Sequence, residues 1–399
     1  MSEELSSTVV ATDDSPSLST GRPAYVRAAV SMPNGTTVVR TLDAGQSVGA
    51  VGWLEIESSA VCGTDITMYR AGLASPTVLG HHVVGTITSL DPGHAEAWGV
   101  IVGDRVALEE YLPCLRPECC ACRTGCYRMC PETDLWSGRR RVGLISAAQG
   151  SGLYGGNAEF MQLTANSILH KLPDELDSNL AAWTQPFANA IDWTIDAGGA
   201  RSGSTVVVIG PGYHGIAAVA AARAADAERI VVIGLPEDSG RLEIAEAMGA
   251  TPVVSKDGNL TELILRSTGG LGADVILDTV GLGAVAVSAA AGSLRKFGRL
   301  VVGGLGSAPL CDLDLASLVR GANAIVGVRG RSPQAVARSV DILASGRSGL
   351  DIVSTVGIAL EEIDAVFAAV AEGRGPTSPH LVVRPRLGVG AHQLQRRDI

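Results

Sequence analysis

The sequence lacks several features that mark particular classes of protein. Charged residues make up only 18% of the 399 residues, and a net charge of −10 argues against a nucleic-acid or anionic-membrane surface. No apolar stretch approaches the roughly 20 residues that a membrane span needs. The first residues, MSEELSSTVVATDDSPS, have neither the basic region nor the apolar run of an export signal. We therefore expect a cytoplasmic protein with no nucleic-acid or membrane partner.

The composition indicates a well-cored α/β protein of two or three domains. Hydrophobic residues make up 46% of the chain, which also contains 49 glycines. Aromatic residues, at 4%, are scarce, which disfavours a wide aromatic pocket. The Ser-, Thr- and Asp-rich segment 1–22 is predicted to be a disordered tail, and 389–399 is expected to be a second loose end.

Six of the eight cysteines are concentrated in the segment YLPCLRPECCACRTGCYRMC. Four of them have a spacing typical of a closed tetrahedral zinc site, which would anchor a loop with little core of its own: Cys114, Cys119, Cys122 and Cys130. A disulfide staple is the alternative, but it requires an oxidising compartment. Cys120 and Cys126 are then spare, and either could take the place of Cys114.

Hydrophobic patterning changes near residue 204. Residues 24 to about 185 hold short β-like runs separated by Gly, Pro and Asp turns, which favours a mostly antiparallel domain. From Ser204, continuous apolar strands alternate with Ala-rich helices, which predicts a parallel sheet covered on both faces. After about residue 330, a short helix–strand–helix–strand segment is expected to pack back on the first domain.

A glycine-rich turn follows the first of these apolar strands, TVVVIG. A helix comes after it, so the turn fits a dinucleotide-binding fingerprint, in which glycines permit the tight turn, the approach of a pyrophosphate and helix–strand packing. The helix N-terminus adds partial positive charge. The turn comprises Gly210, Pro211, Gly212, Tyr213, His214 and Gly215.

The next strand, RIVVIG, ends at Gly234, where an acidic residue usually binds the adenosine ribose. Without that carboxylate the barrier to a 2′-phosphate is gone, and Arg241 follows as a candidate phosphate partner. These residues favour NADP slightly over NAD. A solvated Arg241 without a ligand is the alternative.

The order of motifs resembles that of the medium-chain, zinc-type alcohol dehydrogenases. The shared motifs run from about residue 24 to 385: VCGTD at 61–65, GH at 80–81, GDRV at 103–106, the cysteine segment, GPGYHG, GADVILDTVG and FGRLVVGG. The resemblance implies a GroES-like catalytic domain (23–185, with a zinc lobe at 111–131), a Rossmann domain (186–328) and a C-terminal return to the catalytic domain (329–388). It also implies a homodimer or homotetramer, and cofactor contacts at Val280 and Gly303.

The same resemblance assigns roles to residues near the two short motifs. Cys62 and His81 match ligands of a catalytic zinc, Thr64 matches a proton-relaying hydroxyl, and Asp65 matches a carboxylate that orients the imidazole.

Two departures stand out. The usual Gly-His-Glu reads Gly80-His81-His82, and the position of a further ligand holds Gln185, whose neutral amide binds zinc poorly. One thiolate, imidazoles and an amide would leave the metal at about +1. His82 could be a third ligand, although neighbouring residues of a strand point to opposite faces.

These features leave three functions open. The first is a zinc-assisted NAD(P)-dependent dehydrogenase that interconverts a secondary alcohol or polyol with its carbonyl compound. The second is a metal-free NADPH-dependent reductase of a C=C, C=N or carbonyl group, which keeps the structural zinc and uses Thr64 or His82 as general acid. The third is a non-catalytic NAD(P)-binding protein.

Overall fold

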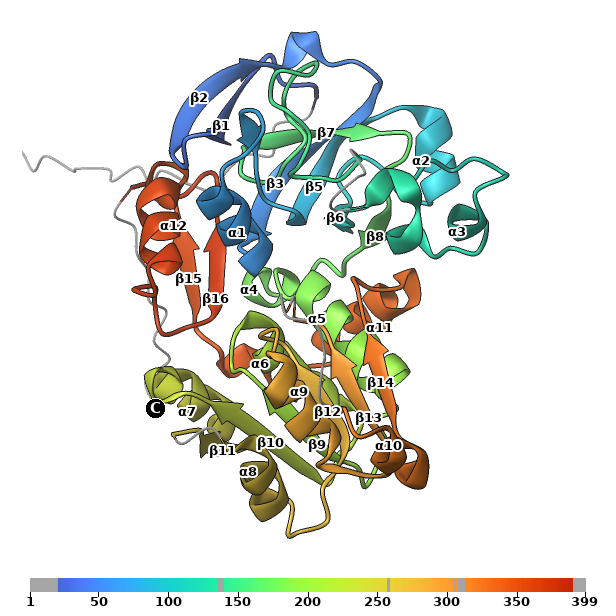
Figure 1. Cartoon of the computed structure of the whole chain (residues 1–399). Helices are drawn as coiled ribbons and strands as arrows, with labels where there is room; N and C mark the ends of the chain where they lie inside the picture. The colour runs from blue at the N-terminus through green and yellow to red at the C-terminus, as the bar shows by residue number, and fades with distance from the viewer. Residues whose placement is uncertain (1–20, 135–139, 257–258, 305, 307–312, 390–399) are drawn as a thin grey trace, which may run out of the picture.

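A computed structural model describes residues 21–134, 140–256, 259–304, 306 and 313–389 of the chain. The predicted tails at 1–22 and 389–399 lie almost entirely outside these ranges. Figure 1 shows two halves, one above the other, joined in the middle by helices α5 and α11. The lower half holds the parallel sheet, and the upper half holds antiparallel sheets together with the C-terminal strands.

The predicted parallel sheet is present and has six strands in the order β11-β10-β9-β12-β13-β14. This is the doubly wound Rossmann order, in which the strand sequence reverses between β9 and β12. The strands are β9 (Thr205–Ile209), β10 (Arg229–Gly234), β11 (Thr251–Val254), β12 (Ala273–Asp278), β13 (Leu294–Val302) and β14 (Ala324–Gly327).

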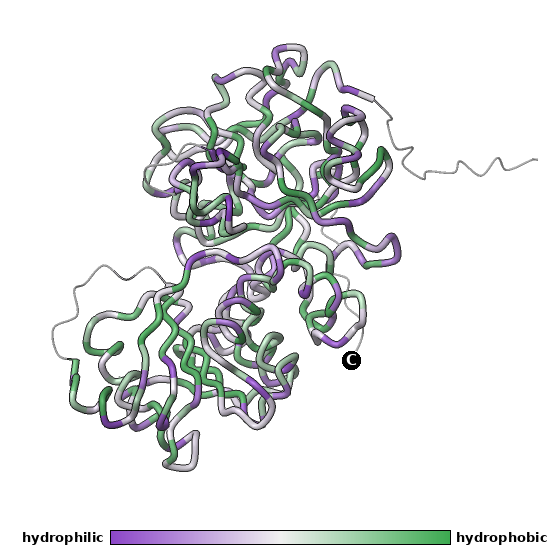
Figure 2. The backbone as a smooth tube through the Cα atoms, turned by 90° about the vertical axis from the view of Figure 1, so that its right-hand side faces the viewer, coloured by the Kyte–Doolittle hydropathy of each residue, from purple (hydrophilic) through white to green (hydrophobic). Residues whose placement is uncertain are grey.

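Apolar side chains point alternately to the two faces of the sheet along β9, which explains why helices cover both faces. Val206 and Val208 pack in the hydrophobic cluster that contains Ile216 of α6, whereas Val207 and Ile209 pack in the cluster that contains Val287 of α9. The helices associated with the sheet are α5 (Thr184–Ile191), α6 (Tyr213–Ala224), α7 (Ser239–Ala247), α8 (Leu260–Ser267), α9 (Ala284–Ala291), α10 (Leu315–Gly321) and α11 (Pro333–Ala344). Figure 2 shows the apolar segments gathered inside both halves.

The other half is built from two further sheets. One has the order β2-β1-β4, and the other has the order β15-β16-β3-β5-β6-β8, with β7 also paired to β3. Their strands are β1 (Tyr25–Ser31), β2 (Thr37–Asp43), β3 (Ala50–Ala60), β4 (Thr77–Val78), β5 (His82–Leu90), β6 (Arg105–Leu108), β7 (Phe160–Thr164), β8 (Leu169–Lys171), β15 (Thr355–Ile358) and β16 (His380–Val383).

The C-terminal segment returns to this half as the sequence predicts, because Val382 and Val383 of β16 pair antiparallel with Ala60 and Ser59 of β3. The remaining helices of this half are α1 (Gly63–Ala71), α2 (Pro92–Trp98), α3 (Cys120–Arg123), α4 (Ser178–Ala181) and α12 (Ile363–Ala371). The predicted domain limits near 185 and 328 stay predictions, because α5 and α11 pack in one hydrophobic cluster at the junction.

Candidate active site

The turn into helix α1 holds Cys62 in place. Cys62 caps the helix, and its backbone N–H donates to the Asp65 carboxylate at 2.9 Å. The other oxygen of Asp65 accepts from the backbone of Gly80 at 3.3 Å and lies 3.1 Å from Nδ1 of His81. One buried carboxylate thus ties the Cys62 segment to the His81 segment, which is the position that the resemblance implies for it.

A sharp turn at Gly80 aims His81. Gly80 has a φ of +92°, and a Cβ there would lie 2.4 Å from Oγ of Ser59 and 2.5 Å from Oδ1 of Asn157. Only glycine fits this backbone and this space. Because Nδ1 of His81 is engaged by Asp65, its Nε2 is the ring nitrogen that stays available to a metal.

The structure corrects the expectation that His81 and His82 point to opposite faces. Strand β5 begins at His82, so His81 lies before the strand and the alternation rule does not apply to the pair. Their ring centroids are 4.5 Å apart. The candidate ligand atoms of Cys62, His81 and His82 all lie within 4.8 Å of one another, and all three residues are buried.

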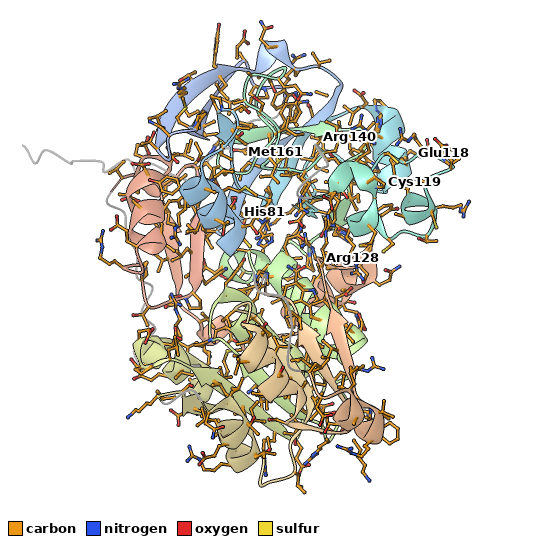
Figure 3. All side chains as sticks on the ribbon, in the orientation of Figure 1. His81, Glu118, Cys119, Arg128, Arg140 and Met161 are labelled. Atoms are coloured by element: carbon orange, nitrogen blue, oxygen red, sulfur yellow. The ribbon has the colours of Figure 1, made fainter. Side chains whose placement is uncertain are left out.

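These three residues fit a zinc ion by their chemistry. A thiolate and two imidazoles are donors that zinc prefers, and their lone pairs converge in a site shielded from water. The Thr64 hydroxyl oxygen lies 3.8 Å from Sγ of Cys62, so it borders the same space. Figure 3 places His81 near the middle of the molecule, close to the level at which the two halves meet.

Gln185 lies in α5, and it is buried. Its Nε2 donates to the carbonyl oxygen of Leu108, which pairs in the sheet with Val83, the residue after His82. Its Oε1 has no hydrogen-bond partner within the described part of the chain. An orphaned buried oxygen near His82 is a feature that a cation or a substrate hydroxyl would satisfy.

Sequence reasoning missed a buried cluster of charges beside the histidines. Oε2 of Glu110 lies 3.8 Å from Nε2 of His81 and 3.9 Å from Nε2 of His82. Its Oε1 accepts from Arg141 at 2.6 Å. The fully buried Arg331 has its Nη1 3.9 Å from Oε2 of Glu110 and donates to Oδ1 of Asn189 at 3.2 Å. No motif marks Glu110 or Arg331, since only the fold brings them here.

The charges of this cluster set the protonation of the site. Burial alone would lower the pKa of His81, but the Asp65 carboxylate raises it well above its ordinary value. Burial, and after it the charges of His81 and Arg331, lower the pKa of His82 well below its ordinary value. Burial would raise the pKa of Glu110, but Arg141 and Arg331 keep it low, so this carboxylate stays ionised.

The glycine turn has the geometry of a dinucleotide fingerprint. Gly210 has a φ of +96°, and a Cβ on Gly215 would lie 1.8 Å from the carbonyl oxygen of Gly210. Gly215 therefore allows helix α6 to pack on the turn, and Gly212 caps the N-terminus of α6, where anions bind favourably. Pro211 lies between the two glycines of the turn.

Two side chains of this turn reach the histidine cluster. The hydroxyl of Tyr213 lies 3.5 Å from Nδ1 of His82, and Nε2 of His214 lies 3.1 Å from Nδ2 of Asn189. Burial and the charge of Arg331 lower the pKa of His214 to about 4, so its imidazole is neutral at pH 7. The predicted meeting of the glycine turn with the 62 and 81 segments is thus present in the structure.

The remaining predicted cofactor residues lie at the carboxyl edge of the parallel sheet, where ligands of this fold bind. Gly234 ends β10, and a Cβ there would come within 3.1 Å of Pro211 and Asp238. Arg241 lies in α7, with Nη1 3.6 Å from the Asp238 carboxylate. Val280 follows β12 and is exposed, and Gly303 follows β13. Binding by these residues stays a prediction.

The cysteine lobe forms a separate cluster. Cys114, Cys119, Cys122 and Cys130 offer sulfur atoms that all lie within 4.8 Å of one another, whereas Cys120 is exposed and, like Cys126, lies outside the group. A distance of 3.6 Å between the sulfurs of Cys114 and Cys122 excludes a disulfide between them. Figure 3 shows Cys119 at the outer edge of the molecule.

The pKa values of two cysteine thiols in the lobe bear on metal binding. The backbone N–H of Arg116, followed by the neighbouring thiols, lowers the pKa of Cys114 to about 7. Burial raises the pKa of Cys122 to about 12, and the nearby thiols add to this shift. Four thiolates could coexist here only beside a cation, which is the charge that Zn²⁺ would supply.

Comparisons with known proteins identify the family. Residues 53–174 match the alcohol dehydrogenase GroES-like domain, and residues 215–345 match the zinc-binding dehydrogenase domain. A protein of Mycobacterium tuberculosis described as a probable alcohol dehydrogenase is 33% identical over 83% of this chain and 91% of its own length. The chain belongs to the zinc-type alcohol dehydrogenase family. It is therefore an oxidoreductase, and zinc and a nicotinamide dinucleotide are the cofactors of its family.

Other relatives and solved structures agree in length and fold. An erythritol/L-threitol dehydrogenase of Mycolicibacterium smegmatis is 28% identical over 82% of this chain and 90% of its own. An alcohol dehydrogenase from Thermus sp. ATN1 superposes with a TM-score of 0.76 at 25% identity, over 90% of this chain and 99% of the other. An Escherichia coli CFT073 alcohol dehydrogenase complexed with NADH superposes with a TM-score of 0.76 at 18% identity, over 91% of this chain and 100% of the other.

None of the helices within the described ranges combines the length and the apolar character that a bilayer crossing needs.

Proposed function

We propose that this protein is an NAD(P)-dependent dehydrogenase that interconverts a secondary alcohol or polyol with its ketone or aldehyde, assisted by zinc bound at Cys62, His81 and His82. The convergence of these three buried donors within 4.8 Å carries the proposal. The contact between His82 and Tyr213 supports it, because it puts the donors next to the cofactor turn. The relatives described as alcohol and polyol dehydrogenases support the substrate class.

Zinc held by Cys62, His81 and His82 would supply Lewis-acid chemistry toward the substrate oxygen, and a nicotinamide dinucleotide held at the glycine turn would supply hydride transfer. The residues of this chain do the rest. Asp65 holds His81 in the tautomer with a bare Nε2, and His82 presents a bare Nε2 when its Nδ1–H donates to Tyr213. Thr64 accepts or releases the hydroxyl proton of the substrate at its Oγ1.

The glycine turn orients the cofactor. The amides at the N-terminus of α6 would hold the pyrophosphate of the dinucleotide, next to the side of the site where Tyr213 contacts His82. Neutral His214 and the side chain of Trp193, which stacks on it at 5.1 Å, close this side of the site against water. We also propose that the four lobe cysteines hold a second, structural zinc, and that the active protein is a homodimer or homotetramer.

Elemental analysis of the purified protein, together with turnover of a panel of secondary alcohols and polyols, tests the proposal. The parent should hold two zinc ions per chain. Cys62→Ala should hold one and lose at least about a thousandfold in kcat/KM, since removing a ligand removes the Lewis acid. Equal zinc and equal turnover in both proteins contradict the proposal. One zinc in the parent, with NADPH-dependent reduction of a C=C or C=N bond, favours the metal-free reductase.

A further inference from the structure

Glu110 is fixed in position by the backbone and by an arginine. It lies two residues beyond β6, and its carbonyl oxygen accepts from the backbone of Val142 at 2.9 Å. Its Oε1 accepts from Arg141 at 2.6 Å, and Arg141 is itself buried. The carboxylate therefore cannot rotate freely, and Oε2 is held toward the two histidines.

Three candidate ligand atoms face one another at this point once both histidines are neutral, as metal ligation requires. Nδ1 of His81 is engaged by Asp65 and Nδ1 of His82 by Tyr213, so the Nε2 atoms of both rings remain. Oε2 of Glu110 lies 3.8 Å and 3.9 Å from these two atoms. Lone pairs that converge in a buried site repel one another unless a cation lies among them.

The distances from Oε2 of Glu110 to the two histidines approach those between ligands of one zinc ion, although Glu110 lies outside the group of donor atoms that are all within 4.8 Å of one another. With zinc–ligand bonds of about 2.0–2.1 Å, tetrahedral ligand atoms lie about 3.4 Å apart. The distances from Oε2 of Glu110 to the two Nε2 atoms exceed this ligand–ligand separation by about half an ångström. Small side-chain rotations would remove the difference. Arg331 does not take the place of the cation, because its Nη1 is 3.9 Å from Oε2 and instead donates to Asn189.

We propose that Glu110 is the anionic oxygen ligand of the metal at Cys62, His81 and His82, so that the substrate oxygen would bind as a fifth ligand. This inference rests on the proposed function. It resolves the charge deficit left by His82 and Gln185, because one thiolate and one carboxylate together neutralise Zn²⁺. The carboxylate that the family motif puts at position 82 is supplied in this chain from the loop after β6.

The competing explanation is that Glu110 only balances the charges of Arg141 and Arg331. Glu109 provides a matched control, because it is also a fully buried carboxylate, and it pairs with His170 at 2.7 Å instead of the cluster. Removing either charge disturbs a buried ion pair, but only Glu110 faces Nε2 of His81 and His82.

Cobalt substitution separates the two explanations without relying on turnover. Co²⁺ is exchanged into the parent, Glu110→Gln and Glu109→Gln, and the spectrum of Cys62→Ser is subtracted to remove the lobe contribution. We expect Glu110→Gln to shift the visible ligand-field bands of the remaining site and to lower its metal affinity about 100-fold or more relative to Glu109→Gln. Parent-like bands in Glu110→Gln overturn the proposal, whatever the affinity.

A double variant keeps the test decisive if Glu110→Gln folds poorly. H82E/E110Q restores one carboxylate at the position of the family motif, so we expect its affinity for cobalt to return to within about tenfold of the parent. A natively folded double variant that binds no cobalt at this site overturns the proposal. The parent itself tests the proposed function separately: if Cys62→Ser and the parent have the same cobalt spectrum, the zinc-assisted reaction fails, and not merely the role of Glu110.

Discussion

The lobe cysteines come from one short stretch, 114–130, whereas Cys62, His81 and Glu110 come from three segments that only the folded sheet brings together. The lobe lies at the edge of the molecule and closes its cluster with four thiols of its own. The central cluster is buried and lies beside the cofactor turn. We propose that the cluster that is local in sequence stabilises a loop, and that the cluster assembled from distant segments serves the reaction.

The largest expected effect is on the lobe. Cys122→Ser removes one of four thiolates from a segment with little apolar core, so the lobe should unfold locally when zinc is lost. We expect limited trypsin digestion after Arg123 to accelerate at least about 100-fold. The matched control is Cys120→Ser, which removes an exposed thiol outside the cluster and should leave the rate unchanged. Equal digestion of the two variants would show that the lobe holds no structural metal.

Acid should destabilise the junction of the two halves through His380. Burial, and then Arg384, lower the pKa of His380 to about 3, while the unfolded chain has a pKa near 6.5. The unfolded state therefore binds more protons between these values, and stability falls as the pH drops below about 6.5. Each pH unit should cost about 1.4 kcal/mol through this group.

His380 stacks on Trp183 at 4.1 Å, close to Tyr213, so its replacement tests this region. In denaturant titrations from pH 7 to pH 4, His380→Gln should lose about 3 kcal/mol less free energy of unfolding than the parent over that range. Identical pH slopes for the two proteins would contradict a neutral buried His380.

The Thr64 hydroxyl should matter for turnover and not for metal content. Thr64→Val removes the proton-carrying group but leaves Cys62 and His81 in place, so we expect kcat to fall about 100-fold with two zinc ions retained. Thr64→Ser keeps the hydroxyl and should stay within about tenfold of the parent. If the kcat of Thr64→Val equals that of the parent, the Thr64 hydroxyl takes no part in the proton transfer.

The smallest effect concerns the choice of dinucleotide. Among the described residues, Arg241 pairs with Asp238 at 3.6 Å and with the carbonyl oxygen of Thr377 at 3.3 Å, so its guanidinium keeps donors for a 2′-phosphate. Arg241→Ala should raise KM for NADP(H) about tenfold and leave KM for NAD(H) unchanged. A parallel change in both constants would assign Arg241 to folding instead of cofactor choice.

Local features could be predicted from the sequence, and long-range convergence could not. The glycine turn and the parallel sheet follow from apolar runs and glycine spacing, and both are present. The prediction for His82 was incomplete because the sequence does not reveal the positive φ of Gly80. With this φ the chain turns sharply, and β5 begins at His82, one residue after His81. Glu110 and Arg331 carry no motif, and their meeting depends on sheet register and on the junction with α11.

Anomalous scattering at the zinc edge from crystals of the purified protein tests the central claim most directly. The account predicts two peaks per chain, one among the four lobe sulfurs and one bounded by Sγ of Cys62, the Nε2 atoms of His81 and His82, and Oε2 of Glu110. A single peak in the lobe, with the central site free of metal in a protein that still oxidises alcohols, would contradict it.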